Sequence, residues 1–225
     1  MRSDDPLGIG ASGWYETLLS GLLSSIAKPW HSFVDVGANV GWYSCLLAPH
    51  VKSVVAFEPE EESHRVLLLN TSVHPNIRCV KAAVGDRAGA STLAVNPGNT
   101  ADSRIVSTAS KWPVQHIDVV KLDDAVDSAD VIKVDVQGWE LGVLSGGGRC
   151  LHSATALAIE LTPGMAPGGM DGTKEVIRMI CEAGFNRFIA IRRRCNARVV
   201  DRDALLKAVA ELGRSKDIDV LCLKL

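Results

Sequence analysis

The chain has 225 residues, with 24 lysines and arginines against 26 aspartates and glutamates, so its formal net charge is −2. That balance excludes a general attraction to nucleic acid, whose binding proteins usually carry a basic excess or stripe. The start MRSDDPLGIG carries acids where a signal peptide would carry bases, and the apolar segment Leu18–Ala27 is too short and serine-rich for a membrane span. We expect one soluble, cytoplasmic domain over residues 1–225, with no membrane contact.

Two hydrophobic periods alternate along the chain. Short apolar, β-branched runs predict parallel strands at Phe33–Val36, Ser53–Phe57, Ile77–Ala82, Val131–Val134 and Ala156–Leu161. Helical patterns cover Trp14–Ala27, Trp42–Pro49, Glu60–Val73, Trp139–Leu151 and Thr173–Ala183. The alternating tail Asp217–Lys224 predicts a further strand paired with Arg187–Ile191. The alternation implies right-handed crossovers and a doubly wound, Rossmann-like α/β sheet with helices on both faces.

Three irregular or terminal segments complete this organisation. Residues 1–30 form an N-terminal helical cap, residues 96–113 a polar loop, and residues 162–172 a loop rich in proline and glycine. Long loops in a compact domain are often binding loops. We expect the last two to bind the substrate.

Six cysteines are present, and none belongs to a C-x-x-C pair. Most lie in apolar segments, where a free thiol behaves as a small hydrophobic side chain. In a mid-sized intracellular chain we expect reduced core cysteines, with neither a zinc site nor a redox motif. They are Cys45, Cys79, Cys150, Cys181, Cys195 and Cys222.

The segment FVDVGANVGWYS leaves the first strand for a helix. In an open parallel sheet, ligands bind beyond the carboxyl ends of the strands. Asp35 would repel a phosphate and suits a ligand with a positive amino group. Glycines let the backbone approach a ligand closely, although a purely structural turn also uses them. The loop residues predicted to bind are Gly37, Ala38, Asn39 and Gly41.

A second acid, Glu58 in AFEPE, ends the second strand next to Pro59. A carboxylate there can accept both hydroxyls of a ribose, or it can favour the start of the next helix. Ala83, Gly85 and Asp86 follow the third strand, where adenine recognition is expected. Amine, ribose and adenine together describe S-adenosylmethionine. NAD is disfavoured because the loop after the first strand, GANVG, lacks the G-x-G-x-x-G pattern, and because Asp35 stands where a pyrophosphate would bind.

Five motifs in order carry a family resemblance: FVDVGANVGWYS, AFEPEEESHRVLLLN, AAVGDRAGASTL, VVKLDD and IKVDVQGWELGVLSGG. They resemble the FkbM family of S-adenosylmethionine-dependent methyltransferases over roughly residues 13–163. The resemblance implies a seven-stranded sheet, mostly parallel with a reversed last strand. It also implies O-methylation of a hydroxyl on a sugar, nucleoside, polyketide or other secondary metabolite.

Two positions bear on that resemblance. The family commonly has I-D-V-E-G-x-E where this chain has DVQGWE, so Gln137 replaces an acid, and any role for this position is weakened. Glu16, in GWYE, stands where the family often has G-x-x-E. It is predicted either to close the cofactor pocket or to be an exposed helix residue.

Three carboxylates are expected near the transferred methyl group. Asp135 ends the fourth strand, Glu140 follows in the next helix, and Glu160 ends the fifth strand. Methyl transfer needs alignment of the reactants and removal of the acceptor proton, and Asp135 is the favoured general base. Alternatively, Asp135 and Glu160, with Glu140, hold Mg²⁺ or another divalent cation. A structural alternative has Glu140 capping its own helix.

The remaining charged candidates favour simpler interpretations. Lys133 is predicted to bury its stem and to extend its ammonium into solvent. His116 is a weaker catalytic candidate at the pocket edge. The basic run Arg192–Arg194, with Arg198, is predicted to be a solvated strand end, although an acidic substrate or an RNA backbone would also suit it.

The leading hypothesis is therefore a small-molecule O-methyltransferase. A nucleic-acid ribose methyltransferase is the second, disfavoured by the few aromatics and the lack of a basic stripe. A non-catalytic cofactor-binding protein is the third. The expected partner is a small-molecule acceptor, and a homodimer is left open.

Overall fold

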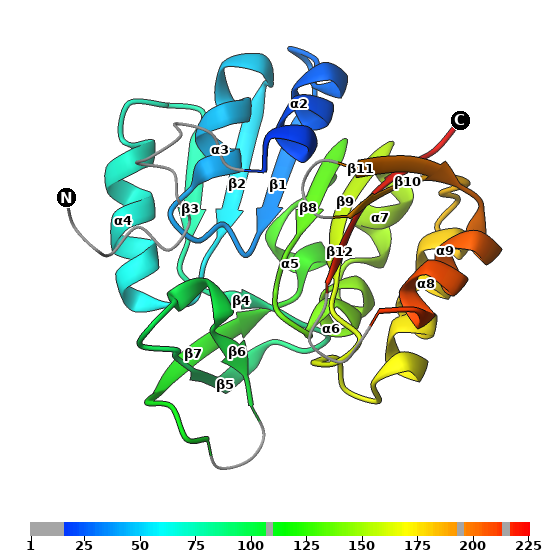
Figure 1. The fold of residues 1–225 in the computed structure, drawn as a ribbon. Helices are drawn as coiled ribbons and strands as arrows, with labels where there is room; N and C mark the ends of the chain where they lie inside the picture. Colours follow the sequence, from blue (N-terminus) through cyan, green and yellow to red (C-terminus); the bar gives the residue numbers. More distant parts are fainter. Residues whose placement is uncertain (1–15, 107–109, 193–195, 213–216) are drawn as a thin grey trace.

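A computed structural model of the chain describes residues 16–106, 110–192, 196–212 and 217–225 (Figure 1). Its main sheet has eight strands in the order β11-β10-β12-β9-β8-β1-β2-β3. The parallel strands are β1 (Ser32–Val36), β2 (Ser53–Phe57), β3 (Ile77–Val80), β8 (Val131–Val134) and β9 (Ala156–Leu161). The reversed last strand, β12 (Ile218–Leu223), lies antiparallel between β9 and β10 (Arg187–Arg192), and β11 (Asn196–Val200) adds an edge strand.

Helices cover both faces of this sheet (Figure 1). One face carries α2 (Thr17–Ile26), α3 (Trp42–Leu47), the short η1 (Ala48–His50) and α4 (Glu61–Thr71). The other carries α5 (Leu122–Ala125), α6 (Glu140–Ser145), α7 (Gly148–Ser153), α8 (Met170–Glu182) and α9 (Arg202–Ala210). In the described part of the chain, no helix is long and apolar enough to cross a bilayer.

The central strands are apolar throughout because both of their faces are buried. Successive strand side chains point to opposite faces. Phe33 accordingly packs in the core with Leu23 of α2, whereas Val34 packs in the core with Val143 of α6. This two-sided burial confirms the predicted doubly wound sheet and its mostly parallel strands.

A second, four-stranded sheet was absent from the sequence prediction. Its order is β4-β7-β5-β6, and Figure 1 shows it beyond the arrowheads of β1 and β2. A small core of Ala83, Leu93, Ile117 and Val119 stabilises it. The strands are β4 (Ala83–Val84), β5 (Gly89–Ala94), β6 (Arg104–Ile105) and β7 (Val114–Val120).

Several predicted boundaries are corrected. The loop predicted at 96–113 contains η2 (Thr100–Asp102) and β6. The helix predicted at 139–151 is broken into α6 and α7, because the backbone of Gly146 packs directly against that of Gly85. A Cβ on residue 146 would lie 1.9 Å from the Gly85 carbonyl oxygen. The predicted seven strands become eight because β11 is largely exposed and so lacks a buried face for periodicity to reveal. Trp14, Arg193, Arg194 and Cys195 lie outside the described residues.

Candidate functional site

A cavity of about 800 Å³ lies where the central strands end, between the main and the second sheet. The loops after β1, β2, β8 and β9 form one side of it, and residues 101–105 form part of the other. It brings together many of the predicted residues: Glu16, Gly37, Ala38, Asn39, Glu58, Pro59, Ala83, Asp135 and Glu160. The predicted residues Asp35, Gly41, Gly85, Asp86 and Glu140 do not line it.

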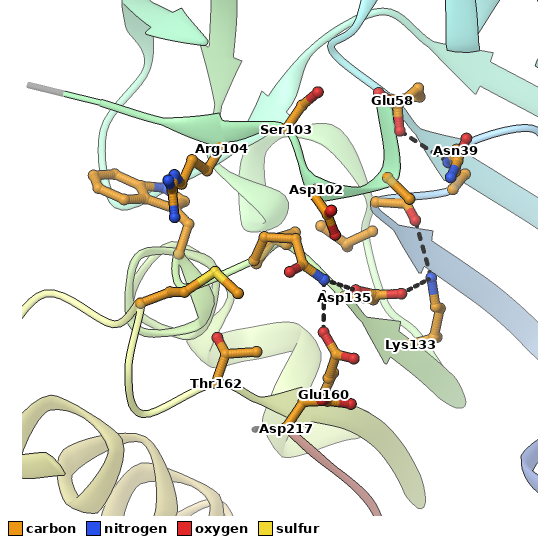
Figure 2. Close-up of a pocket in the computed structure, with 18 of the residues that line it drawn as sticks. Asn39, Glu58, Asp102, Ser103, Arg104, Lys133, Asp135, Glu160, Thr162 and Asp217 are labelled. Carbon is orange, nitrogen blue, oxygen red and sulfur yellow. Dashed lines mark hydrogen bonds and ion pairs between the residues drawn. The ribbon is translucent and has the colours of Figure 1, made fainter. Parts of the chain in front are cut away.

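Glu58 is fixed by main-chain hydrogen bonds at the end of β2. Its Oε2 accepts from the backbone N–H of Asn39 at 2.8 Å, and its Oε1 accepts from that of Glu60 at 2.9 Å (Figure 2). Burial raises the pKa of Glu58 to about 7. Since a carboxylate has about four acceptor positions, two remain for hydroxyl groups of a ligand.

The Asn39 side chain is the second polar feature at this end. Among the described residues, its buried Oδ1 has no hydrogen-bond partner. Its backbone is left-handed, with φ 51°, a conformation that non-glycine residues adopt uncommonly. Buried polar atoms are rarely left unpaired, so this acceptor is suited to a donor on a ligand.

Asp35 does not contact the pocket, contrary to the prediction. Its side chain is fully buried, accepts a hydrogen bond from Ser44 Oγ at 2.7 Å and lies 3.5 Å from Lys133 Nζ. The strand turns this side chain under α3, the helix that carries Ser44. Asp35 therefore anchors Lys133 rather than a ligand amine.

The glycines of the first loop also serve protein packing. Gly37 has φ 77°, and a Cβ there would lie 1.9 Å from the carbonyl oxygen of Asp135. Gly41 has φ 89°, and its Cβ would lie 2.6 Å from Leu67 Cδ1 on α4. Close approach of chain to chain, together with positive φ, explains both positions. Only Gly37 also lines the cavity.

Lys133 is buried along its whole length, contrary to the predicted solvent-exposed ammonium. Its Nζ donates to the Gly37 carbonyl at 2.9 Å and lies 3.4 Å from Asp135 Oδ2 (Figure 2). It also sits 5.3 Å from the centre of the Tyr43 ring, whose hydroxyl donates to Glu16 at 2.5 Å. One cation thus ties the ends of β1 and β8 together below the pocket.

Gln137 lies between the two acids predicted to hold a metal. Its Nε2 donates to Asp135 Oδ1 at 3.2 Å and to Glu160 Oε2 at 2.7 Å. Burial, with Asp135 and Asp219 nearby, raises the pKa of Glu160 well above its ordinary value, which favours its neutral form. Among the described residues no group of three histidine, cysteine or acidic side chains is arranged for a metal. The donor set therefore does not support the predicted divalent cation.

Glu140 holds two loops together and does not reach the cavity. It is 2% exposed, and its Oε1 accepts from the Gly138 backbone at 2.7 Å and from Thr162 Oγ1 at 3.2 Å. These bonds join the loop after β8 to the end of β9. The geometry therefore supports the structural alternative for Glu140, not the catalytic role.

Gly85 and Asp86 are turned away by the second sheet. Asp86 is exposed and pairs with Arg87 at 3.3 Å, because the chain there turns outward toward β5. Gly85 packs against Val119 of β7. Ala83 and Leu93 supply the apolar wall on this side.

Other lining residues were not assigned individual roles by the sequence interpretation, although the loop 96–113 was expected as a whole to bind the substrate. They belong to the second sheet and its loop, or to the start of β12: Asp102, Ser103, Arg104, Asp217 and Asp219. The sequence could have placed Asp217 and Asp219 of DIDV together, since residues two apart on a strand point to the same face. The loop residues were predicted only as part of the long polar loop 96–113, because β6 is two residues long and shows no period.

The strand order, with an antiparallel last strand inserted beside β9 and the pocket over β1 and β2, defines a class I methyltransferase fold. Solved structures agree. A methyltransferase FkbM from Methylobacillus flagellatus KT matches with a TM-score of 0.54 at 17% identity, over 87% of this chain and 44% of that one. An rRNA methylase from Streptococcus thermophilus gives 0.54 at 13% identity, over 93% and 95% of the two chains. A Streptococcus mutans protein in complex with S-adenosylhomocysteine gives 0.52 at 13% identity, over 92% and 96%.

Residues 35–187 match the family model of the methyltransferase FkbM domain, and the chain belongs to this family of methyltransferase enzymes. A relative, the hexuronic acid methyltransferase AglP of Haloferax volcanii, is 28% identical over 152 residues, which are 66% of this chain and 61% of AglP. The match thus spans less than two thirds of that relative and less than half of the Methylobacillus protein.

Proposed function

We propose that the protein transfers a methyl group from S-adenosylmethionine to a hydroxyl group of a small molecule. The observation that carries the proposal is one cavity lined both by Glu58, with two acceptor positions left, and by Asp135, which is ion-paired to Lys133. Glu58 suits the hydroxyls of a ribose, and Asp135 suits removal of a proton from an acceptor hydroxyl beside it.

The residues of this pocket fit the cofactor. Glu58 has acceptor positions for two ribose hydroxyls, the unpaired Oδ1 of Asn39 can accept from a donor of the ligand, and Ala83 and Leu93 offer an apolar wall to a base. When bound, S-adenosylmethionine supplies an electrophilic methyl carbon on a sulfonium.

Asp135 is the residue proposed to take the proton of the acceptor hydroxyl. The Lys133 ammonium lies 3.4 Å from one of its carboxylate oxygens, and the Gln137 amide donates to the other. Burial raises the pKa of Glu160 and favours its neutral form, which is a poorer base. Together these contacts orient the Asp135 carboxylate at the pocket surface.

The acceptor class is proposed from the relative's name and the pocket's lining. A hexuronic acid methyltransferase acts on a sugar derivative, and carboxylate-rich pockets accept hydrogen bonds from sugar hydroxyls. We propose a sugar or a related metabolite as the acceptor. The cytoplasmic location, the homodimer and the absence of nucleic-acid partners stay predictions.

Calorimetric titration with S-adenosylhomocysteine, with and without magnesium and beside an NADH control, tests the proposal. We expect micromolar binding of S-adenosylhomocysteine only, unaffected by magnesium. Binding of NADH, or of neither compound, would overturn the cofactor assignment. Radiolabelled methyl transfer to a panel of sugars then tests the acceptor class.

A further inference from the structure

Arg104 is a half-buried cation in the pocket wall, and its guanidinium has no hydrogen-bond acceptor among the described residues. It begins β6, where its backbone pairs with Ala94 of β5, and its Cζ lies 4.7 Å from the centre of the Trp112 ring. Within the described residues this ring is its one recorded partner, with no hydrogen bond and no ion pair. Because the ring accepts no hydrogen bond from the guanidinium among those recorded for the described residues, the N–H donors of Arg104 stay available to a ligand.

The other pocket cations already have partners. Lys133 is held by Gly37 and by Asp135, and Arg192 donates to the Ala208 carbonyl and lies 3.9 Å from Glu211. Asp102, two residues from Arg104, accepts instead from Asn96 Nδ2 at 3.3 Å. A partly desolvated charge without a partner is costly, so Arg104 is suited to an anion that a ligand brings.

The position of Arg104 orients such a ligand. Figure 2 shows Arg104 on the opposite side of the pocket from Lys133, with Asp135 between them and Glu160 and Asp217 below. The carboxyl groups of Asp135 and Asp217 would repel an anionic group placed beside them. An anionic acceptor can therefore bind in one direction, with a neutral hydroxyl toward Asp135 and its charge toward Arg104.

We infer that Arg104, whose guanidinium lies over the Trp112 ring, is the subsite for a carboxylate or phosphate group of the methyl acceptor. A guanidinium binds either group with two parallel N–H donors. The inference rests on the proposed function and deepens it, because it assigns an anionic acceptor, such as a uronic acid or a sugar phosphate.

The test measures acceptor binding to protein saturated with S-adenosylhomocysteine. Methyl glucuronide, glucose 6-phosphate and the neutral methyl glucoside are compared by calorimetry. We expect at least one anionic sugar to bind at least about tenfold more tightly than the glucoside. Arg104→Met should remove this preference, and Arg104→Lys should retain part of it, since lysine keeps the charge without the fork. The preferred anion separates carboxylate from phosphate.

Lys111→Met is the matched control. Lys111 is exposed, its Nζ lies 5.8 Å from the centre of the same Trp112 ring, and it does not line the cavity. This variant should keep the full preference, and unchanged affinity for S-adenosylhomocysteine in all variants shows intact folding. Equal binding of the three sugars, tighter binding of the glucoside, or equal losses in Arg104→Met and Lys111→Met would overturn the inference alone. A wild-type protein that does not bind S-adenosylhomocysteine would overturn the proposed function and the inference with it.

Discussion

The two sides of the pocket differ in how their polar groups are satisfied. On the side of β1, β2 and β8, the main chain fixes Glu58 through two N–H groups, and Lys133 is bound by a carbonyl and two acids. On the side of the second sheet, Arg104 has an aromatic ring and no acid within the described residues. A side whose charged groups are held in place by the protein before binding, here called the fixed side, suits an unchanging cofactor. The side of the second sheet, with open donors on Arg104, suits selection among acceptors.

The largest expected effect comes from Asp135, the proposed base on the fixed side of the pocket. Asp135→Asn should lower kcat by about 10²–10⁴-fold, because the amide cannot take the acceptor proton. Affinity for S-adenosylhomocysteine should stay within about threefold of the wild type, since Glu58 and Asn39 are untouched. Single-turnover kinetics and calorimetry measure the two quantities.

Glu160→Gln is the matched control for that substitution. Because burial and the neighbouring acids favour the neutral form of Glu160, an amide replaces a group of similar shape and charge, and kcat should change far less than in Asp135→Asn. An equal loss in both variants would show that the two residues act as one unit. Lost cofactor binding in Asp135→Asn would contradict the assignment of the base.

The next prediction tests how far the fixed side depends on the close contact between the backbones of Gly37 and Asp135. Gly37→Ala places a Cβ 1.9 Å from the Asp135 carbonyl oxygen at φ 77°, so we expect a loss of about 3 kcal/mol or more in the free energy of unfolding. Gly21→Ala, in α2 with nothing within 4 Å of its Cβ, should instead stabilise by about 0.5–1 kcal/mol. Denaturant unfolding measures both. A tolerated Gly37→Ala would mean that the two loops can separate.

This contrast also shows what the sequence could reveal. The motif FVDVGANVGWYS located the pocket correctly, because strand ends and glycines are local signals. It could not assign Asp35, since only the three-dimensional packing shows that this side chain points under α3 toward Ser44. The burial of Lys133 depends on Gly37, 96 residues away in the chain. Arg104 depends on a two-residue strand, which is too short to show a period.

A smaller effect is expected where Glu140 joins two loops without reaching the pocket. Glu140→Ala leaves the Gly138 N–H without its buried acceptor, which costs about 1–3 kcal/mol of stability. The midpoint of thermal unfolding should fall by roughly 2–4 °C per kcal/mol for a chain of this size.

Glu62→Ala is the control for this substitution. It removes an exposed ion pair with Arg65 and should cost less than about 1 kcal/mol of stability. If the folded Glu140→Ala protein lost kcat while its stability fell only by the expected amount, Glu140 would have a catalytic role after all.

The mildest test varies pH across the pKa of Glu58. The pKa is raised from 4.5 to about 7 by burial, so the folded cofactor-free protein holds a proton on Glu58 that the unfolded chain has lost between these values. This group's contribution to stability must therefore decrease as pH rises through that window. Affinity for S-adenosylhomocysteine should change in the opposite direction and increase toward pH 8, because ribose hydroxyls donate to the ionised carboxylate. Calorimetry from pH 5.5 to 8.5 measures this, and Glu58→Gln should flatten the profile. An equally steep profile in Glu58→Gln would assign the titration to another group.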